Sequence, residues 1–600
     1  MKKAEKYYLN RIKEADEKIK GFNKISSIIG WLRLIIVIVG IIFAYDFYKV
    51  KEVMNCILTV VIALVIFAIV AKIHAKYLNK IERLEIIKEI NEKGIKRLNG
   101  EYKEFEDKGI DLIEESHPFC EDLDIFGQNS LFQMINTTRT KGGRNKLGKI
   151  LSMNVLPSKK EVEERQESIK ELAKKIEWRQ KLYVDATFKR TKDEELDQLI
   201  QWCNEKGTTN YSRLIVAGLF IAITFACIFA AIIGAIPASV LLLNFMVNYV
   251  ILKILTNDKD EAINLFQTMK YSVKAYTNIL SLIEDEKFES SYLVNLKKQL
   301  NNENESCKVE MKKLSSLLDW VGDSSGNAYF FIFNTIAFAD VFILNNLNKW
   351  REQNGAKLEK WLDVMSEFEA LASISNIAFD NEEYCYPVIL DNKSVKAVEV
   401  KHPLIGDKAV SNSYNLVEPK KVTLITGSNM SGKSTFLRTI GINLVLSYIG
   451  APTCAKEFEC SIMSIYTCMR TKDNLEESIS SFYAEILRIK LIIEACKKGE
   501  NVFFLLDEIF KGTNSRDRHI GATVLVKQLI ENKAIGLLST HDLELCDLEN
   551  EMKEIENYNF REYYEDNKIK FDYKLRKGKS MTQNAVYLMR LAGIEINENL

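Results

Sequence analysis

The stretch KVTLITGSNMSGKSTFLRTIGINLVL (residues 421–446) decides the fold of the C-terminal part of the chain. Its apolar residues Val422 to Thr426 predict a short strand, and a helix is expected to begin near Lys433. The loop between them matches G-x-x-x-x-G-K-[ST], in which glycines let backbone N–H groups close around a phosphate. The start of the helix adds unpaired N–H groups and the positive end of its dipole. The sequence therefore predicts a nucleotide site at this loop.

The loop also supplies side chains with distinct expected roles. Lys433 is placed to reach the β- and γ-phosphates of ATP, and the hydroxyl of Ser434 is placed to bind Mg²⁺. The predicted ATP-binding loop consists of Gly427, Ser428, Asn429, Met430, Ser431, Gly432, Lys433, Ser434 and Thr435.

Two further apolar runs end in polar residues that suit ATP hydrolysis. The first, at 501–506, is followed by Asp507, expected to hold Mg²⁺, and by Glu508, expected to act as the general base for the attacking water. The alternative is that the acidic pair only caps a helix. The second run, Ala534 to Ser539, is followed by Thr540 and His541, and we expect His541 to sense the γ-phosphate through a hydrogen bond. The alternative for this histidine is a structural role.

Composition bounds the class of protein. A chain of 600 residues is too long for one hydrophobic core, so three or four units are expected. The formal net charge of zero argues against a strongly basic nucleic-acid binder. The 11 cysteines are scattered without a C-x-x-C pair, which indicates reduced thiols in the cytosol.

Four apolar runs predict two transmembrane helical hairpins. Each run approaches the roughly 20 residues that a bilayer-spanning helix needs. They are Ile25 to Tyr45, Val53 to Ala71, Leu214 to Gly234 and Ile236 to Leu252. For the first pair, the alternative is a buried helical hairpin in a soluble core, although such helices rarely lack a polar face.

Charges beside these runs predict the orientation of the chain. Lysines and arginines lie at the outer ends of both pairs, which places the N-terminus, the middle region and the C-terminus in the cytoplasm of a multi-pass cell-membrane protein. A fifth apolar run, Tyr329 to Leu344, contains Asn334 and Asp340. Because of its length and polar content, we predict a buried soluble helix there.

These patterns divide the chain into seven segments. The last is expected to be an α/β domain, because short apolar runs alternate with helices. The segments are a cytoplasmic N-terminal segment (1–24), the first hairpin (25–71), a helical connector (72–120), the first part of a core (121–213), the second hairpin (214–252), a helical lever (253–384) and an ATPase domain (385–600).

Several motifs together resemble the MutS mismatch-repair family, a branch of the ABC-type ATPases. The ATPase motifs are GSNMSGKST (427–435), SSFYAE (480–485), LLDEIFKGTNSRD (505–517) and STHDLEL (539–545). KHPLI (401–405) resembles the R-H-P element of the family, residues 122–172 resemble the start of its core, and 367–378 resemble the end of its lever.

The resemblance implies an ABC-type α/β P-loop ATPase domain that follows a mostly helical core and lever. It implies Mg²⁺-dependent hydrolysis of ATP to ADP and phosphate, in composite sites of a homodimer. Ser480 and Ser481 would form a signature-like element that reaches the partner's ATP, and Asp517 would lie in the segment that crosses the dimer. His541 would be the switch histidine. Val410 and Asn412, upstream of the loop, would contact the base.

The chain also departs from the family. Ser431 replaces a glycine of the loop, and Phe510-Lys511 replaces a Gly-Arg pair. Apolar segments stand where the family has its mismatch-reading domain and its DNA clamp. Two hypotheses therefore remain: an ATP-dependent DNA-binding protein of repair or recombination at the membrane, or a membrane ATPase that moves its hairpins or a protein partner without DNA. A third, an anchor with an inactive ATPase, conflicts with the complete set of catalytic residues.

Overall fold

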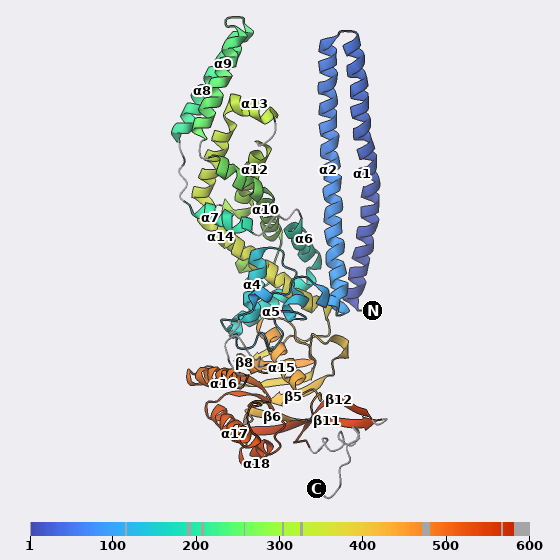
Figure 1. Cartoon of the computed structure of the whole chain (residues 1–600), viewed down its shortest axis with the longest axis vertical. Helices are drawn as coiled ribbons and strands as arrows, with labels where there is room; N and C mark the ends of the chain where they lie inside the picture. Colours follow the sequence, from blue (N-terminus) through green and yellow to red (C-terminus); the bar gives the residue numbers. More distant parts are fainter. Residues whose placement is uncertain are drawn as a thin grey trace.

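A computed structural model places the α/β domain at one end of an elongated molecule and the apolar helices at the other (Figure 1). The structure describes residues 2–580, with gaps at 115–116, 189–193, 206–208, 210, 257–258, 303–304, 325–327, 471–480 and 566–567.

The larger sheet of the C-terminal domain is built around β6 (Val422–Thr426), in which every residue is buried. Its strand order is β12-β11-β6-β10-β9-β8, and all neighbours are parallel except β11 and β12. The continuous apolar runs suit parallel strands buried on both faces. The other strands are β8 (Ser464–Cys468), β9 (Val502–Asp507), β10 (Ile535–Ser539), β11 (Ile555–Glu565) and β12 (Lys568–Lys577).

A second, mixed sheet of four strands lies within the predicted ATPase segment, and the sequence patterns did not predict it. Its order is β3-β7-β4-β5, with bounds Val388–Leu390, Glu457–Ser461, Val395–Val400 and Asn412–Leu416. The helices of the domain are α15 (Lys433–Tyr448), α16 (Ser481–Lys497), α17 (Ser515–Glu531) and α18 (Leu548–Glu551).

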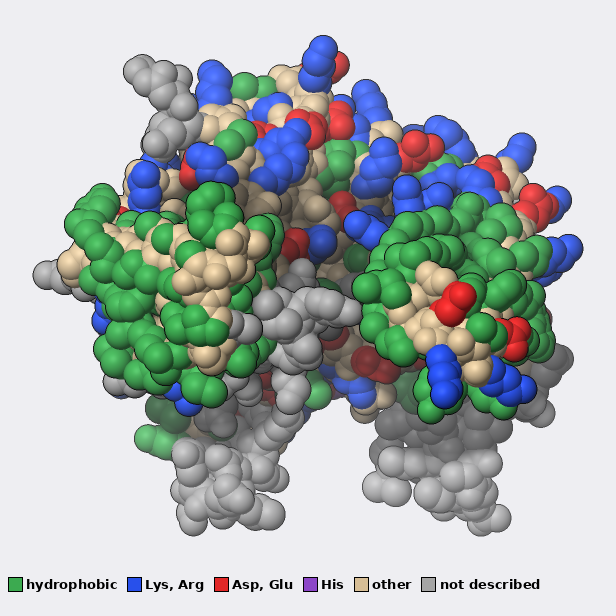
Figure 2. All heavy atoms as spheres, turned by 90° about the horizontal axis from the view of Figure 1, so that it is seen from above, with side chains coloured by type: hydrophobic (Ala, Val, Ile, Leu, Met, Phe, Trp, Pro, Cys, Tyr) green, Lys and Arg blue, Asp and Glu red, His purple; other side chains and the backbone are tan. Residues whose placement is uncertain are grey.

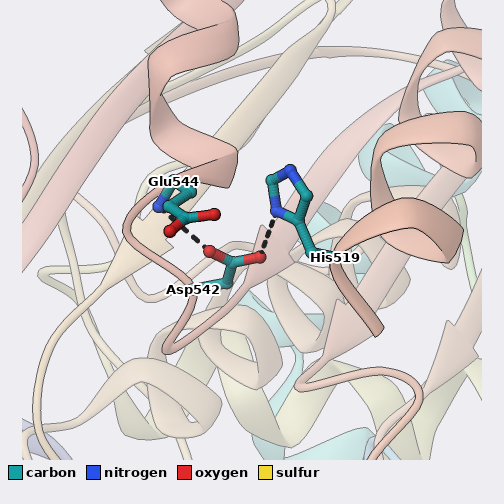
Figure 3. A group of neighbouring side chains, drawn as sticks. All are labelled: His519, Asp542 and Glu544. Atoms are coloured by element: carbon teal, nitrogen blue, oxygen red, sulfur yellow. Dashed lines mark hydrogen bonds and ion pairs between the residues drawn. The ribbon is translucent and has the colours of Figure 1, made fainter. Parts of the chain in front are cut away.

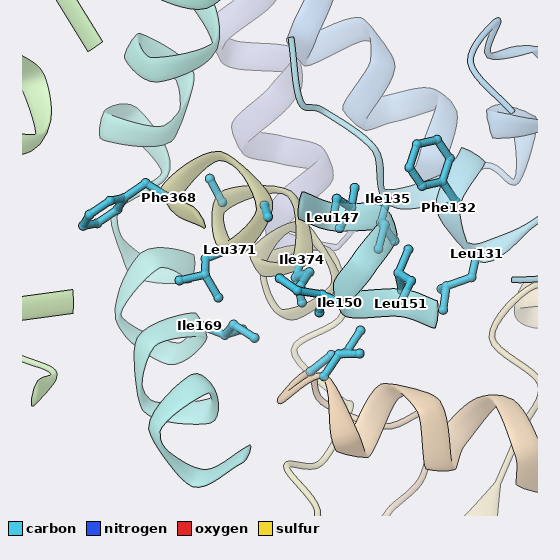
Figure 4. Packing of buried hydrophobic residues seen from close by; sticks show 14 of the residues in the cluster. Leu131, Phe132, Ile135, Leu147, Ile150, Leu151, Ile169, Phe368, Leu371 and Ile374 are labelled. Atoms are coloured by element: carbon cyan, nitrogen blue, oxygen red, sulfur yellow. The ribbon is translucent and has the colours of Figure 1, made fainter. Parts of the chain in front are cut away.

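The core packs against the end of one long helix, α14 (Ala339–Asp380), which has 42 residues. Leu371 and Ile374 of α14 are fully buried among the side chains of α3 (Leu131–Ile135), α4 (Lys141–Ser152) and α5 (Lys159–Lys174) (Figure 4). Each such residue contributes about 1.5–3 kcal/mol by its burial. Because α14 continues from this core to the apolar end, it connects the two ends of the molecule (Figure 1).

Further helices complete the middle of the molecule. Of these, α10 and α12 pack against each other and against α14. Their bounds are α6 (Ile176–Thr187), α7 (Glu194–Asn204), α10 (Lys259–Asp285), α11 (Ser291–Lys298) and α12 (Cys307–Ser324).

The two N-terminal apolar runs lie in two long helices, α1 (Lys3–Lys49) and α2 (Val53–Leu98), that run side by side (Figure 1). From Lys3 onward, the predicted N-terminal segment is therefore the first half of α1, and the predicted connector begins inside α2. Charged residues with good helix propensity let both helices continue beyond their apolar parts.

The next two apolar runs form α8 (Tyr211–Ile232) and α9 (Ala238–Leu255), with Pro237 at the start of α9. Among the described residues, α1, α2 and α8 are long and apolar enough to cross a membrane, whereas the apolar helix at Ser239–Leu255 is shorter. Both pairs project to the same end of the molecule (Figure 1).

The fifth apolar run is not one buried helix, and that prediction was wrong. α13 (Ala328–Ala337) is separated from α14 by Phe338, whose φ of 50° is left-handed. The side chain of Asn334 stabilises this break, because its Oδ1 accepts a 3.0 Å hydrogen bond from the Asp340 N–H and its amide donates to the Asp340 carboxylate. Phe331 is also 56% exposed.

Candidate nucleotide site

The loop after β6 closes on itself in a way that requires glycine. Gly427 and Gly432 have φ values of +151° and +109°. A Cβ added at Gly427 would lie 2.7 Å from Ser431 Oγ and 2.9 Å from the Phe560 carbonyl oxygen. The hydroxyl of Ser431 is buried and has no hydrogen-bond partner among the described residues. The loop therefore forms a tight backbone cradle that encloses the Ser431 hydroxyl oxygen.

Lys433, the first residue of α15, points back into this cradle. Its Nζ donates hydrogen bonds to the carbonyl oxygens of Gly427, at 3.0 Å, and Ser428, at 3.1 Å, and lies 3.4 Å from Glu508 Oε1. Burial lowers the pKa of Lys433, and the nearby Glu508 carboxylate opposes this shift. The ammonium group is thus held inside the loop rather than in solvent.

Glu508 lies at the centre of a charged cluster. His541 Nε2 is 3.0 Å from Glu508 Oε1, and Lys511 Nζ is 3.1 Å from Oε2. The hydrogen bond from His541 holds the pKa of Glu508 well below its usual range, so the group is a carboxylate. His541 Nε2 also lies 2.9 Å from Asn429 Oδ1. The structure therefore brings together Lys433, Glu508, His541 and Asn429.

Asp507 ends β9 at the edge of the sheet where the loop begins. Its carboxylate accepts a hydrogen bond from the hydroxyl of Ser539, the last residue of the neighbouring β10. Ser539 in turn lies opposite Ile425 of β6. Carboxylate and hydroxyl oxygens such as those of Asp507 and Ser434 are ligands that Mg²⁺ prefers.

A pocket of about 530 Å³ opens beside the loop and contains both predicted base-contact residues, Val410 and Asn412. The side chain of Asn412 is engaged with β12, because its amide donates to the Tyr573 carbonyl oxygen at 3.0 Å and its oxygen accepts from the Leu575 N–H at 2.8 Å. Of the predicted loop residues, 429–435 line this pocket, together with Glu508.

Sequence reasoning missed several residues of this site. Tyr573 of β12 lines the pocket, and a Cβ added at Gly432 would lie 3.2 Å from its ring. Lys511 contacts Glu508, and Glu562 accepts a 2.8 Å hydrogen bond from the Ser428 hydroxyl. The alternation of apolar and charged residues in KIKFDYKLRK (568–577) is the signal that marks Tyr573 as a strand residue.

Of the residues expected to act across a dimer, the structure describes the side chain of Asp517 only. Ser480 lies outside the described residues, and Ser481 begins α16. Asp517 lies in the first turn of α17, where its N–H donates to the side chain of the N-cap Asn514 at 2.9 Å. Asp517 is exposed and does not line the pocket.

The turn after His541 is stabilised by a second histidine (Figure 3). His519 Nδ1 lies 2.6 Å from Asp542 Oδ2, and the Glu544 N–H donates to Asp542 Oδ1 at 2.9 Å. Asp542, which directly follows His541, thus links this turn to His519 of α17. The contact orients the turn that carries His541.

Comparisons with known proteins gave matches to the C-terminal part of this chain. Residues 423–597 match the family model of MutS domain V. The DNA mismatch repair protein MutS of Listeria welshimeri is 29% identical over 243 residues, which cover 39% of this chain and 28% of that protein. The MutS proteins of Bacillus velezensis and Clostridium botulinum are 30% and 27% identical, with 39% and 42% of this chain and 28% of each relative covered. The C-terminal part of the chain is thus similar to the ATPase domain of MutS, and its N-terminal part differs from full-length MutS.

Proposed function

We propose that the chain is a membrane-anchored ATP hydrolase that converts ATP to ADP and phosphate. The contact of Lys433, Glu508 and His541 beside the glycine loop is the observation that carries this proposal. Lys433 is placed to bind the β- and γ-phosphates, and Glu508, ionised and held by His541, is placed to accept a proton from the attacking water.

The residues around the loop fit a triphosphate with Mg²⁺. The backbone cradle has room only for glycine at 427, and the buried Ser431 hydroxyl offers a further hydrogen bond. Ser434 and Asp507 would hold Mg²⁺, and the ion supplies charge neutralisation at the phosphates. Val410 and Tyr573 border the side of the pocket where a base would lie.

The apolar helices support membrane anchoring. Figure 2 shows two separate clusters of hydrophobic side chains at the end of the molecule, with lysines and arginines around them. They belong to the pairs α1/α2 and α8/α9, whose outward residues are largely exposed. Exposed apolar surface of this extent marks a binding surface, and its length suits a bilayer. The positive flanks favour a cytoplasmic core and ATPase domain.

The polar residues inside the first pair fit this assignment. Arg33 Nη1 lies 3.1 Å from His74 Nδ1, and His74 Nε2 lies 2.9 Å from the Ser26 hydroxyl. The Arg33 guanidinium also lies 4.9 Å from the centre of the Phe67 ring. Arg33 therefore has polar and aromatic partners within the pair, which reduces the cost of its position near a membrane surface.

The dimer is also a proposal and rests on similarity to MutS. In a homodimer, Ser480, Ser481 and Asp517 would approach the ATP of the partner subunit, so that each site is completed by the other copy. The exposure of Asp517 in this chain is compatible with such a contact.

DNA binding is the second candidate function, because the curated relatives are DNA mismatch repair proteins. Five lysines of the predicted helical lever would favour DNA binding if they formed a basic face, but two of them are paired with carboxylates, which favours the membrane-side function instead. Lys308 pairs with Asp285 at 2.5 Å, and Lys313 pairs with Glu310 at 2.6 Å, so these charges are partly neutralised. The remaining members of that face are Lys297, Lys298 and Lys312.

The test is the ATP hydrolysis rate of the detergent-purified chain with and without DNA. Homoduplex, mismatched and branched DNA are compared over a salt series, with Lys433→Ala as the inactive control. We expect basal hydrolysis that Lys433→Ala abolishes. Unchanged turnover in that variant would refute the site. Stimulation by DNA that weakens as salt rises would show phosphate contacts and favour the second candidate.

A further inference from the structure

The short helix α13 is attached to the second apolar pair. It packs against α8 and α9, and it lies beside that pair at the apolar end of the molecule (Figure 1). The amide of Asn248, which is fully buried, donates to the Thr335 carbonyl oxygen at 3.0 Å and to the Thr224 hydroxyl at 2.8 Å. The ring centres of Tyr249 and Phe331 are 5.5 Å apart. These contacts hold α13 to both helices of the pair.

The described side chains of α13 differ in exposure along the helix. Asn334 and Thr335 are buried against the rest of the chain, whereas Phe331 and Phe333 are 56% and 48% exposed. The sequence of α13, AYFFIFNTIA, contains no charged residue. Phenylalanine side chains on the surface of a charge-free helix do not suit an aqueous surface.

We propose that α13 enters the bilayer beside α8 and α9, with Phe331 and Phe333 in contact with lipid. This inference rests on the proposed membrane anchoring. The occupant is lipid rather than a protein partner, because α13 packs against α9 through Phe331 and Tyr249, and α9 itself exposes the apolar residues Met246 and Val250.

The length of α13 limits how far it can reach into the bilayer. Its 10 residues span about 15 Å, which is half of a hydrocarbon core of about 30 Å. The helix therefore enters one leaflet, on the side of the cytoplasmic body, and returns. Its break at Phe338 is compatible with this depth, because the Asn334 side chain hydrogen-bonds the Asp340 N–H freed there.

Photo-crosslinking to lipid tests this assignment. Benzoylphenylalanine replaces Phe331 in the full chain, which is reconstituted in phosphatidylcholine and phosphatidylglycerol vesicles that carry a labelled lipid. The same substitution is made at two control positions, Phe225 on α8 and Tyr271 on α10, which are 60% and 44% exposed. Position 225 is expected in the membrane and position 271 in the cytoplasmic part of the protein. Only variants with the elution volume and unfolding temperature of the unmodified chain are compared.

We expect lipid labelling at 331 that is similar to labelling at 225 and several-fold above that at 271. Labelling at 225 with only background lipid labelling at 331 would overturn the assignment of α13 and leave the membrane anchor intact. Background labelling at 225 as well would overturn the anchor itself.

Discussion

The hydroxyl of Tyr8, in the second turn of α1, donates a 2.7 Å hydrogen bond to Asp380, the last residue of α14. Arg97 of α2 binds the other carboxylate oxygen of Asp380 through Nε at 2.8 Å. The Arg97 and Asp380 side chains are only 6% and 5% exposed. The start of α1 and the end of α2 are therefore joined to the end of α14 that adjoins the α/β domain. A shift of α14 would then also move the first apolar pair.

Replacement of Asp380 should loosen this junction. Asp380→Ala leaves the Arg97 guanidinium buried without its anion, which costs about 3–5 kcal/mol. We expect faster hydrogen exchange in residues 3–14 and 90–98, measured by mass spectrometry. Glu382→Ala is the matched control, because Glu382 pairs with Lys3 at the surface, and such pairs contribute roughly 0–1 kcal/mol. Equal exchange in both variants would show that Asp380 does not hold the helices.

Loss of the Glu508 carboxylate should separate binding from hydrolysis. Glu508→Gln keeps the size of the side chain but removes the base, so hydrolysis should slow by about 10²–10⁴-fold while ATP still binds. The measurements are phosphate release and binding of a fluorescent ATP analogue. Lys511→Met is the comparison, because Lys511 contacts Glu508 without being placed to accept a proton. If Glu508→Gln hydrolyses ATP at the normal rate, Glu508 is not the base.

Tyr573 should contribute to nucleotide affinity. Its ring lies beside Gly432 in the pocket, so Tyr573→Ala removes a surface on which a base can stack. Stacking of this kind contributes about 1–3 kcal/mol, which predicts a rise in Kd of roughly 5- to 150-fold. Tyr563→Ala on β11 is the control, because Tyr563 is exposed and does not line the pocket. Equal affinities for ATP in the two variants would exclude this role.

The buried His402 predicts loss of stability in acid. Burial lowers the pKa of His402 to about 4, below its unfolded value of about 6.5. The unfolded chain therefore binds more protons between these values, and stability falls as the pH falls through that window. At about pH 5.5 the loss is roughly 1.4 kcal/mol relative to neutral pH.

The measurement for His402 is the apparent unfolding temperature at neutral pH and near pH 5.5. His402→Gln removes the titrating group, so its unfolding temperature should fall less on acidification than that of the unmodified chain. An identical fall in both proteins would show that His402 does not cause the acid sensitivity.

Prediction from sequence works well for local features of this chain. The strand at Val422–Thr426 and the helix that begins at Lys433 have the predicted bounds, because an apolar run and a glycine-rich turn specify them within a few residues. The strands that end at Asp507 and Ser539 were predicted for the same reason. The similarity to MutS, predicted from the same motifs, is confirmed over the C-terminal part.

The features that the sequence did not reveal depend on residues far apart in the chain. The place of Tyr573 beside Gly432 depends on the pairing of β11 with β12 and of β11 with β6. The contact between Tyr8 and Asp380 joins residues 372 positions apart.

The sequence by itself thus determined the glycine loop, the acidic strand end and the apolar runs, because each is a local pattern of backbone freedom, charge or hydropathy. Only the tertiary structure decided that Lys433 and His541 both contact Glu508 beside the glycine loop, that α13 lies against α8 and α9, and that the start of α1 and the end of α2 hold the end of α14. These contacts arise from strand order and helix packing, which depend on the burial of distant side chains together and leave no local signal.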